Sequence, residues 1–535
     1  MSKRCHSDEP PNPPPPKRHR ADSGARDYIS SLSDEILLHI LSFLPTQTLL
    51  TCQRISRRFR ELAGDSELWK RQYFSRWVLP RARHAQRIRQ KPDSSGTGYS
   101  PKVSKWIGHS HLAEEGKVSH WKTQYKLRHN WAKGICRVRE LEVAQPPPPP
   151  ILASLSSGIV FTADKLRGLR AWATKQSEKE LARVPFSTGD AAPTALSASQ
   201  GSVSSVLDIA VGFEGGRLDY YQFDAMEAKF TLCFSHVPPE AASITAMALS
   251  PPYLLTISKN KVLSLYKLPA DQPRRSPPAL IASLEAGNIF APLSLSLRYS
   301  DSEVVAAIAY SFCHISSGWS MGIQELHFTR DGDHISSRLA TTVDLQHSGK
   351  IVGSTRARLF FGPSDGQLAS YTIHHRNPPT SVSYAHPYLL TSHSDNTLAM
   401  YLVVSSKDKL TFRSARRLWG HTSSVSRVQV SERGKAVSVS SRGDDIRVWE
   451  LETLVGTTSH RLREENGIRI HPESTDWAGS SPSDSVTINW NRLKTESLPS
   501  DNVYKRGWVG FDDEQVVVLR ERGQGTQLLA CYDFT

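Results

Sequence analysis

A loosely repeated unit runs from residue 151 to the end of the chain and constrains the fold more than any other sequence feature. Each copy is an apolar strand of small residues, a polar turn and a second strand with an aromatic end. Eight copies end at Trp172, Tyr221, Tyr266, Phe328, Tyr371, Tyr401, Trp449 and Tyr532. Most intervals are about 45 to 60 residues, against roughly 40–45 for a four-stranded propeller blade. The 30 residues between Tyr371 and Tyr401 are too few for a blade, so we predict an all-β propeller with seven blades, or alternatively eight.

Positive charge is concentrated in the first quarter of the chain. Residues 1–140 hold 27 Lys and Arg against 13 Asp and Glu, an excess of 27 − 13 = 14. The remaining residues hold 66 − 27 = 39 basic and 52 − 13 = 39 acidic groups, so they are neutral overall. Such an asymmetry indicates two parts with different roles.

Residues 27–75 are predicted to be helical. Leu32, Ile36, Ile40 and Phe43 are spaced three or four apart, which places them in one apolar stripe. Ser33 is positioned to cap this first helix. After a break at Pro45, a second short helix is expected, and a third that closes near Leu68 and Trp69. Three such helices cannot bury much surface alone, so the stripe predicts a docked partner rather than a self-contained core.

The flanking segments have different compositions. Residues 1–26 are polar and proline-rich and are predicted to be a disordered tail. Residues 76–134 are predicted to be a basic linker of helix and loop. Residues 135–535 are assigned to the propeller, in which 472–504, rich in Ser, Asp and Pro, is expected to be a surface loop.

The helical segment resembles an F-box, a module of about forty residues that docks on a Skp-type adaptor. The resemblance implies that the adaptor is bound by Leu32, Ile36, Leu37, Ile40, Leu41, Leu44, Leu49, Ile55, Phe59, Leu62 and Trp69. Ser33 stands where most F-boxes have proline, and Phe59 stands where tryptophan is common. Through the adaptor, the resemblance implies attachment to a cullin-RING ubiquitin ligase core.

The rest of the chain is similar to fungal F-box proteins with WD-repeat propellers. Asn130, Trp131 and Gly134 match the junction before the first propeller strand in that family. The best WD-like repeat opens at Gly420 and His421 and is completed by Ser440, Asp444 and Trp449. The aspartate expected six residues before Trp449 is replaced by Gly443, so the blades are degenerate.

The sequence holds no pattern of a catalytic site. His421, Ser438, Ser440 and Trp449 could suggest a nucleophilic site, but a buried histidine bonded to a strand hydroxyl is the ordinary structural use of these residues. No nucleophile elbow, phosphate-binding loop, dinucleotide fingerprint or metal motif occurs. We therefore expect a non-enzymatic chain with no catalytic residue, cofactor or metal.

The basic residues allow two further readings. Lys3 and Arg4 precede Lys17, Arg18 and Arg20 at the spacing of a bipartite nuclear import signal, with a solubilising tail as the alternative. A second basic cluster could bind nucleic acid, but it lacks interleaved aromatics, so a solvated face or an acidic protein partner is favoured. That cluster comprises Arg76, Arg81, Arg83, Arg87, Arg89 and Lys91.

The compartment is expected to be nuclear, cytoplasmic or both. The first residues lack the apolar core of a signal peptide, and no apolar run reaches the roughly 20 residues of a membrane helix. The chain is therefore expected to be neither secreted nor a membrane protein. The six cysteines are scattered without a close pair, which favours a reducing compartment.

These patterns predict the substrate-recognition subunit of a Skp-cullin-F-box ubiquitin ligase, whose propeller binds an unknown protein substrate. The alternatives are a non-degradative scaffold held by the adaptor and a nuclear scaffold that associates with nucleic acid. Two structural expectations follow. Residues 136–143 should pair with 528–534 and close the ring, because a sealed ring leaves no open edge. Arg413, Arg416 and Arg417 should lie on an outer strand or the turn after it, so substrate binding should not depend mainly on phosphate.

Overall fold

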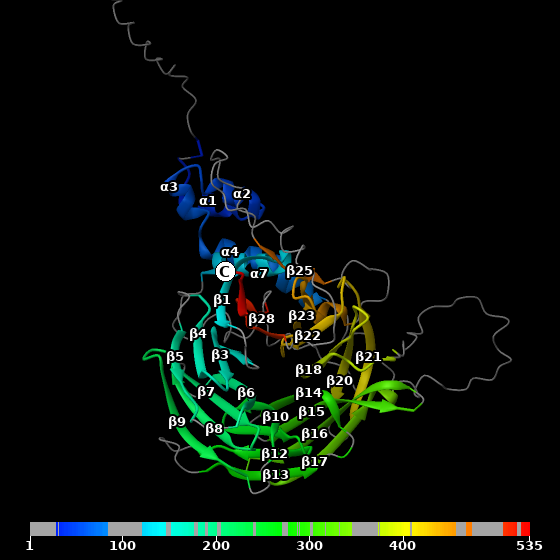
Figure 1. Cartoon of the computed structure of the whole chain (residues 1–535). Coiled ribbons are helices and arrows are strands. Elements are labelled where there is room, and N and C mark those ends of the chain that lie inside the picture. Colours follow the sequence, from blue (N-terminus) through cyan, green and yellow to red (C-terminus); the bar gives the residue numbers. More distant parts are fainter. Residues whose placement is uncertain are drawn as a thin grey trace, which may run out of the picture. The chain divides into compact units, whose positions relative to one another are not determined.

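A computed structural model divides the chain between Ser75 and Arg76 into two compact units (Figure 1). It describes residues 28–83, 120–145, 151–344, 373–455, 467–472 and 507–535. Within these ranges, positions 30, 176–179, 188–190, 201–204, 239–241, 270–276, 286, 288, 300–302, 316, 331, 374, 407–408 and 522–525 are not described. The predicted tail, the import signal, nearly all of the predicted 472–504 loop and the repeat ending at Tyr371 lie outside the described residues.

The first unit contains four short helices, so the expectation of three was wrong. They are α1 (Asp34–Leu41), α2 (Thr46–Cys52), α3 (Arg57–Leu62) and α4 (Ser66–Tyr73). The expected third helix is broken because Asp65 starts a new one, accepting hydrogen bonds from the backbone N–H groups of Glu67 and Leu68. Ser33 occupies the N-cap position of α1 but makes no capping hydrogen bond with its side chain.

Helical structure continues beyond these four helices. A π-helical turn, η1 (Phe74–Val78), follows α4, and α7 (Trp121–Lys133) precedes the first strand. Gly134 ends α7 in the left-handed conformation, with φ +72°. A Cβ atom there would lie 2.1 Å from the backbone oxygen of Arg469, so only glycine fits.

The described residues of the second unit form seven antiparallel sheets, and we call them blades 1 to 7. Blade 1 comprises β2 (Leu152–Ser156), β3 (Ile159–Asp164), β4 (Gly168–Ala173) and β5 (Glu180–Val184). Blade 2 comprises β6 (Pro193–Gln200), β7 (Val206–Phe213), β8 (Leu218–Asp224) and β9 (Lys229–His236). Blade 3 comprises β10 (Ile244–Ser250), β11 (Tyr253–Ser258), β12 (Val262–Lys267) and β13 (Ala279–Glu285).

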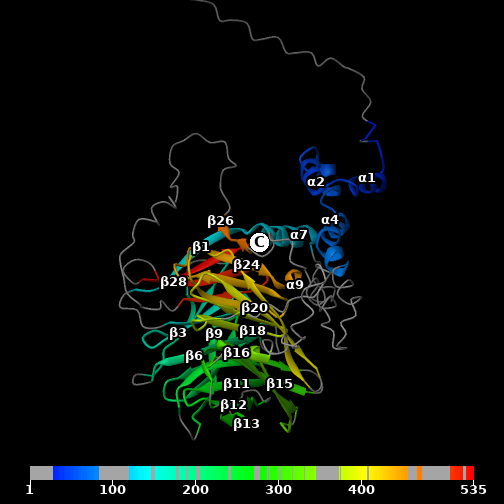
Figure 2. The same ribbon diagram turned by 90° about the vertical axis from the view of Figure 1, so that its right-hand side faces the viewer.

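The remaining blades complete the ring (Figures 1 and 2). Blade 4 comprises β14 (Phe290–Tyr299), β15 (Glu303–His314), β16 (Gly318–Thr329) and β17 (His334–Thr341). Blade 5 comprises β18 (Ser381–Ala385), β19 (Tyr388–Ser392), β20 (Leu398–Ser405) and β21 (Leu410–Leu418). Blade 6 comprises β22 (Val425–Val430), β23 (Lys435–Ser440), β24 (Ile446–Glu450) and β25 (Ile468–Arg469), with α9 (Leu451–Leu454) after its third strand.

Blade 7 joins the two ends of the propeller. It comprises β27 (Trp508–Phe511), β28 (Gln515–Glu521), β29 (Gln527–Asp533) and β1 (Ile135–Ala144), with the short β26 (His471–Pro472) beside β1. Strand β1 pairs antiparallel with β29, and Val138 stands opposite Tyr532. The predicted closure is therefore confirmed, and the propeller has seven blades.

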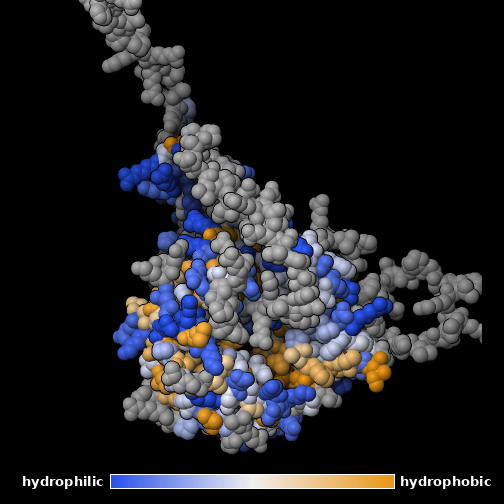
Figure 3. All heavy atoms as spheres, in the orientation of Figure 1, coloured by the Kyte–Doolittle hydropathy of each residue, from blue (hydrophilic) through white to orange (hydrophobic). Residues whose placement is uncertain are grey.

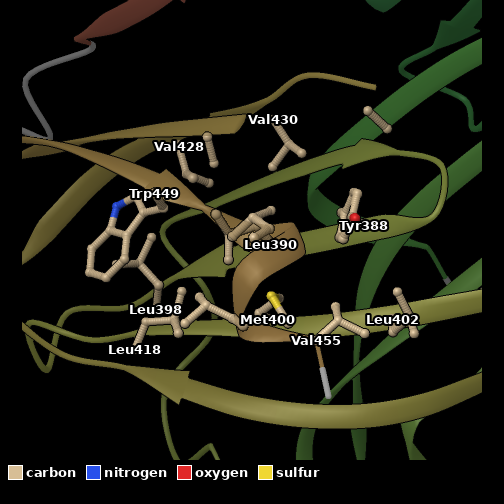
Figure 4. Close-up of a cluster of buried hydrophobic side chains, with 14 of the residues drawn as sticks. Tyr388, Leu390, Leu398, Met400, Leu402, Leu418, Val428, Val430, Trp449 and Val455 are labelled. Atoms are coloured by element: carbon tan, nitrogen blue, oxygen red, sulfur yellow. The ribbon is translucent and has the colours of Figure 1, made fainter. Parts of the chain in front are cut away.

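The core lies between successive blades. Figure 4 shows one such layer, in which Leu390 and Met400 of blade 5 pack with Val428 and Trp449 of blade 6. Apolar residues on both faces of each sheet are buried, as expected for strands with a blade on either side.

A repeated hydrogen bond links most of the innermost strands. In five of them a side-chain oxygen accepts the backbone N–H of the next blade's innermost strand, at 3.0 to 3.2 Å. The acceptors are Ser154, Ser197, Ser294, Ser383 and Gln429. At the two equivalent positions stand Ala248 and Gly510, which carry no side-chain oxygen. A Cβ atom on Gly510 would lie 2.3 Å from the Trp508 ring, so a serine at that position would require the indole to move.

Candidate functional site

Three apolar side chains of α1 and the turn after it are left exposed on the helical unit. Ile36, Ile40 and Phe43 have 50%, 46% and 69% of their surface open to solvent. Their spacing places them on one side of the helix. Leu50 and Ile55, from α2 and the turn after it, are also about half exposed or more. We call these five residues the exposed stripe.

Other residues predicted to bind the adaptor form the core of the same unit instead. Leu37, Leu41, Leu49 and Trp69 are at most 2% exposed, so they pack inside the unit and not on its surface. The Trp69 indole N–H donates to the backbone oxygen of Ala63 at 2.9 Å. Four further predicted residues are partly buried: Leu32, Leu44, Phe59 and Leu62.

Polar contacts hold α1 in place within the unit. Arg58 binds the Asp34 carboxylate at 2.6 Å and donates to the backbone oxygen of Leu32. The side-chain amide of Gln72, on α4, donates to the backbone oxygen of Leu44. These contacts fix the direction in which α1 presents its apolar face. The sequence stripe included Phe43 but missed Leu50, which directly follows a predicted contact residue.

The WD-like residues of blade 6 form a closed polar network. His421 contacts Ser438 Oγ at 2.6 Å and Asp445 Oδ2 at 3.1 Å, and the Trp449 indole N–H donates to Ser438 at 2.8 Å. Hydrogen bonds and charge from His421 and Arg447 outweigh burial and lower the pKa of Asp445 to about 2. His421, Ser438 and Asp445 are buried, so the network serves the blade and not a substrate.

The carboxylate in this network differs from the predicted one. Asp444 accepts a hydrogen bond from Ser440 at 2.9 Å, and neither contacts His421. Asp445 takes the predicted place, in a turn where Gly443 has φ +73°. Gly420 also has a positive φ, before the histidine.

Two other blades carry variants of the His421 network that the sequence patterns missed. In blade 1 the Trp172 indole donates to Thr162 Oγ1 at 2.8 Å, with no histidine in the same place. In blade 5, His375 contacts the Tyr401 hydroxyl at 3.2 Å and stacks on His393 with ring centroids 3.7 Å apart. Burial and the neighbouring His375 lower the pKa of His393 to about 3. Thr162 precedes Trp172 by ten residues and Ser438 precedes Trp449 by eleven, and this spacing would have been the sequence signal in blades 1 and 6.

The predicted junction holds the ring closure. The Asn130 amide donates to the backbone oxygen of Phe534 at 2.7 Å, and the Trp131 indole donates to that of Asp513 at 2.8 Å. Trp131 belongs to the buried cluster that contains Tyr532 and Phe534. Helix α7 is therefore part of the propeller unit, although the sequence placed it in a linker.

A buried group of charges fastens the basic segment to blade 6. Glu450 binds Arg81 at 2.6 Å and Arg128 at 3.0 Å, and these two arginines lower its pKa to about 2 against the effect of burial. Lys435 lies 3.8 Å from the centre of the Trp131 ring. Its pKa falls to about 7, mainly through burial and then through Arg128.

The basic cluster 76–91 is therefore not simply a solvated face. Arg76 donates to the Tyr125 hydroxyl at 2.7 Å, and Arg81 is engaged by Glu450. Arg83 is exposed, whereas Arg87, Arg89 and Lys91 lie outside the described residues. The part of the cluster that the structure describes binds mostly within the unit, which corrects the expectation.

The arginines of blade 5 lie where they were expected. Arg413, Arg416 and Arg417 are on β21, the outermost strand of the sheet. Arg417 stands over the Trp419 ring, 5.7 Å from its centre, and 4.0 Å from Asp395.

Two absences hold for the part of the chain that the structure describes. Among these residues, no group of His, Cys, Asp and Glu side chains could hold a metal ion. No helix among them has the length and apolar character of a membrane span.

Two family models match the chain. Residues 29–75 match the model described as F-box-like, and residues 136–535 match the one described as F-box protein pof12 beta-propeller. The first match coincides with the helical unit that carries the exposed stripe. The second begins within β1 and spans all seven blades.

Curated relatives include three F-box proteins. One from Saccharomyces cerevisiae is 30% identical over 125 residues, 22% of this chain and 18% of that protein. F-box protein pof12 of Schizosaccharomyces pombe is 26% identical over 147 residues, 28% of each chain. F-box protein dre-1 of Caenorhabditis elegans is 42% identical over 48 residues, 9% of this chain and 5% of that protein. Each match covers less than a third of the relative's length.

Proposed function

We propose that this chain, which belongs to the family of F-box proteins with a pof12-type β-propeller, is the substrate-recognition subunit of a Skp-cullin-F-box ubiquitin ligase. The exposed stripe on a unit with its own core carries the proposal. Ile36, Ile40 and Phe43 remain open to solvent although Leu37 and Leu41, on the same helix, are fully buried. Apolar surface exposed to water is unfavourable in free energy, and a docked adaptor would cover it.

The adaptor would bind by helix packing. Fully burying an Ile or Phe side chain contributes roughly 1.5–3 kcal/mol. Burying the exposed half of each stripe side chain on binding would therefore contribute part of that free energy to the affinity for the adaptor. The stripe residues come from α1, α2 and the turns that follow these two helices, so they form a surface and not a single helix face. Such central apolar anchors dominate the free energy of an interface.

The propeller would hold the protein substrate while the ligase core supplies the chemistry. The His421 network is buried and shared within blade 6, so it offers no reactive group. Bringing a substrate lysine close to a charged ubiquitin carrier accelerates transfer by proximity alone. In this proposal the chain acts as a non-catalytic adaptor, and it needs no cofactor.

Co-purification with a Skp-type adaptor tests the proposal. An Ile36→Ala/Ile40→Ala double variant should lose adaptor binding by at least tenfold while its helical circular dichroism is unchanged. Gln47→Ala, exposed on α2, is the matched control and should bind as wild type does. Adaptor binding by the double variant at the wild-type level would contradict the proposal.

Ubiquitin transfer separates the proposal from a non-degradative scaffold. With purified adaptor, cullin-RING core and ubiquitin enzymes, the complex should modify a captured substrate. An assembled adaptor complex that recruits no cullin would favour the scaffold instead. The nucleic-acid alternative gains no support from Arg76 and Arg81, since both are engaged within the propeller unit.

A further inference from the structure

Blade 4 carries a hairpin that extends beyond the rest of its sheet. Strands β15 and β16 are 12 residues each, whereas the second strands of the other blades have 5 to 8. The pairing of β15 with β14 stops at Ser311, and that of β16 with β17 stops at Gly322. Residues 312–315 and 317–320 therefore lie past both flanking strands, and Gly318 and Trp319 form a bridge to His375.

The tip of this hairpin and its surroundings are apolar. Ile315 is fully exposed, and Phe290, at the start of β14, is 48% exposed. The rings of Phe290 and Trp319 meet edge to face, with centroids 6.4 Å apart. Lys261, from the neighbouring blade 3, places its ammonium 5.1 Å from the Phe290 ring centre. We call these four residues the hairpin surface; Figure 3 shows apolar side chains gathered over the region that Figure 1 labels β14.

Two lysines border the hairpin surface, and one exposed acid, Glu285, stands opposite Val262, the residue after Lys261. Lys261 donates to the backbone oxygen of Gly287, and Lys259 is exposed beside it. Among the described residues, neither lysine lies within 4.0 Å of a carboxylate. Residues 311–320 contain no acidic or basic side chain other than His314. The surface therefore offers aromatic and aliphatic contacts bordered by two unneutralised ammonium groups.

The hairpin surface faces away from α7. Strands alternate in direction, so the turn between the second and third strands of every blade lies at the same end of the ring. The contacts of α7 are made at the other end, to Asp513 in the turn after β27 and to Phe534 after β29. A segment bound at the hairpin would not compete with the helix that closes the ring.

We propose that the hairpin surface binds an extended segment of the protein substrate that carries aliphatic or aromatic side chains flanked by Asp or Glu. This inference rests on the proposed function, because it assigns the partner of the same propeller. Aromatic anchors such as Trp319 are typical of binding hot spots. Carboxylates on the partner would neutralise Lys259 and Lys261, which gives orientation and specificity as well as affinity.

Three fluorescein-labelled 12-residue peptides serve as probes for the full-length chain. One alternates Leu and Phe with Asp and Glu, one has Lys in place of the acids, and one has Ser in place of the apolar residues. The first peptide should bind at least tenfold more tightly than the other two. Equal binding of the three, or preference for either of the others, would overturn the proposal.

Substitutions then locate the site. Ile315→Asp, whose side chain is fully exposed and unneeded for folding, should weaken the acidic-apolar peptide at least tenfold, and Lys259→Ser/Lys261→Ser should weaken it three- to tenfold. Met226→Ala is the matched control: Met226 is 85% exposed in the turn between β8 and β9, at the opposite end of the ring. Peptide binding unchanged in Ile315→Asp would refute the assignment.

Two other occupants are distinguished by separate measurements. Sedimentation of the wild-type chain as a dimer, and of Ile315→Asp as a monomer, would assign the surface to a second copy and overturn the proposal. Peptide binding that appears only after deletion of 346–371 would assign it to the chain itself. Adaptor binding is measured on the same variants and should be unchanged, so failure at the hairpin is distinct from failure of the ligase assignment.

Discussion

Trp131 lies flat on Phe534, with ring centroids 3.9 Å apart and 12° between the ring planes. Trp131 lies in the last turn of α7, before the first strand, and Phe534 follows β29, so the stack joins the two ends of the propeller. Lys435 of blade 6 covers the same indole, and the Asn130 amide holds the Phe534 carbonyl. The closure therefore rests on side chains as well as on the pairing of β1 with β29.

Removal of the Trp131 ring should destabilise the whole propeller. Trp131→Ala is expected to lower the free energy of unfolding by about 3–5 kcal/mol, because a fully buried aromatic is lost and a cavity is left. Urea unfolding followed by circular dichroism measures the change. Trp419→Ala removes an indole that is half exposed and should cost under about 1 kcal/mol. Similar costs for the two variants would contradict a special role of Trp131.

The last strand should be indispensable to the ring. Deletion of 527–535 removes β29, which pairs with both β28 and β1 and would leave each with an open edge. We expect loss of the cooperative unfolding transition and aggregation during size-exclusion chromatography. A monodisperse truncated chain with the wild-type transition would show that blade 7 is dispensable.

The hydrogen bonds between innermost strands should each contribute to stability. Ser383→Ala leaves the backbone N–H of Val430 without its acceptor and should cost about 1–2 kcal/mol in urea unfolding. Ser197→Ala should behave in the same way through Leu249. The control is Ser199→Ala, on β6 like Ser197, because the Ser199 side chain makes no hydrogen bond among the described residues. Equal effects of Ser197→Ala and Ser199→Ala would contradict the prediction.

Lys435 should make the stability depend on pH in the neutral to alkaline range. Its pKa is about 7 in the folded chain and about 10.5 when unfolded, so between these values the unfolded chain binds the extra proton. The free energy of unfolding should therefore rise from pH 7 to pH 9, by at most about 1.4 kcal/mol per pH unit. Above pH 9 the opposite trend sets in, since burial raises the pKa of Cys136 and Cys531 to about 12.

The Lys435→Met variant isolates this contribution. Its difference in unfolding free energy from the wild type should be largest at pH 6, in favour of the variant, and shrink as the pH rises through 7 toward 9. Urea titrations at pH 6, 7, 8 and 9 provide the comparison. A difference that does not change with pH would show that Lys435 is charged in the folded chain over this whole range.

The choice of aspartate in blade 6 can be tested by paired substitutions. Asp445→Asn removes the charge that His421, Arg447 and Arg469 contact, and should cost about 2–3 kcal/mol. Asp444→Asn changes an exposed carboxylate and should cost under about 1 kcal/mol. Thermal unfolding of the two variants distinguishes them. A larger loss for Asp444→Asn would restore the assignment made from the sequence pattern.

Local sequence patterns were sufficient to predict the helical segment, the strands and their order along the chain. The spacing of Ile36, Ile40 and Phe43 predicted a helix with an apolar side, because helical periodicity depends only on near neighbours. The strand–turn–strand repeats predicted a propeller for the same reason, and the ring closure followed from the need to pair both ends. The sequence by itself therefore determined the fold class and the two-part organisation.

Tertiary contacts decided which of these residues are exposed and which partners their charged groups have. Leu37 and Ile36 are neighbours of equal apolar character, yet helix packing buries one and leaves the other half exposed. Arg81 forms an ion pair with Glu450, far away in sequence, and His421 contacts Asp445 instead of the predicted Asp444. Local patterns cannot specify these outcomes, because burial and ion pairing depend on the distances that chain packing sets between residues far apart in sequence.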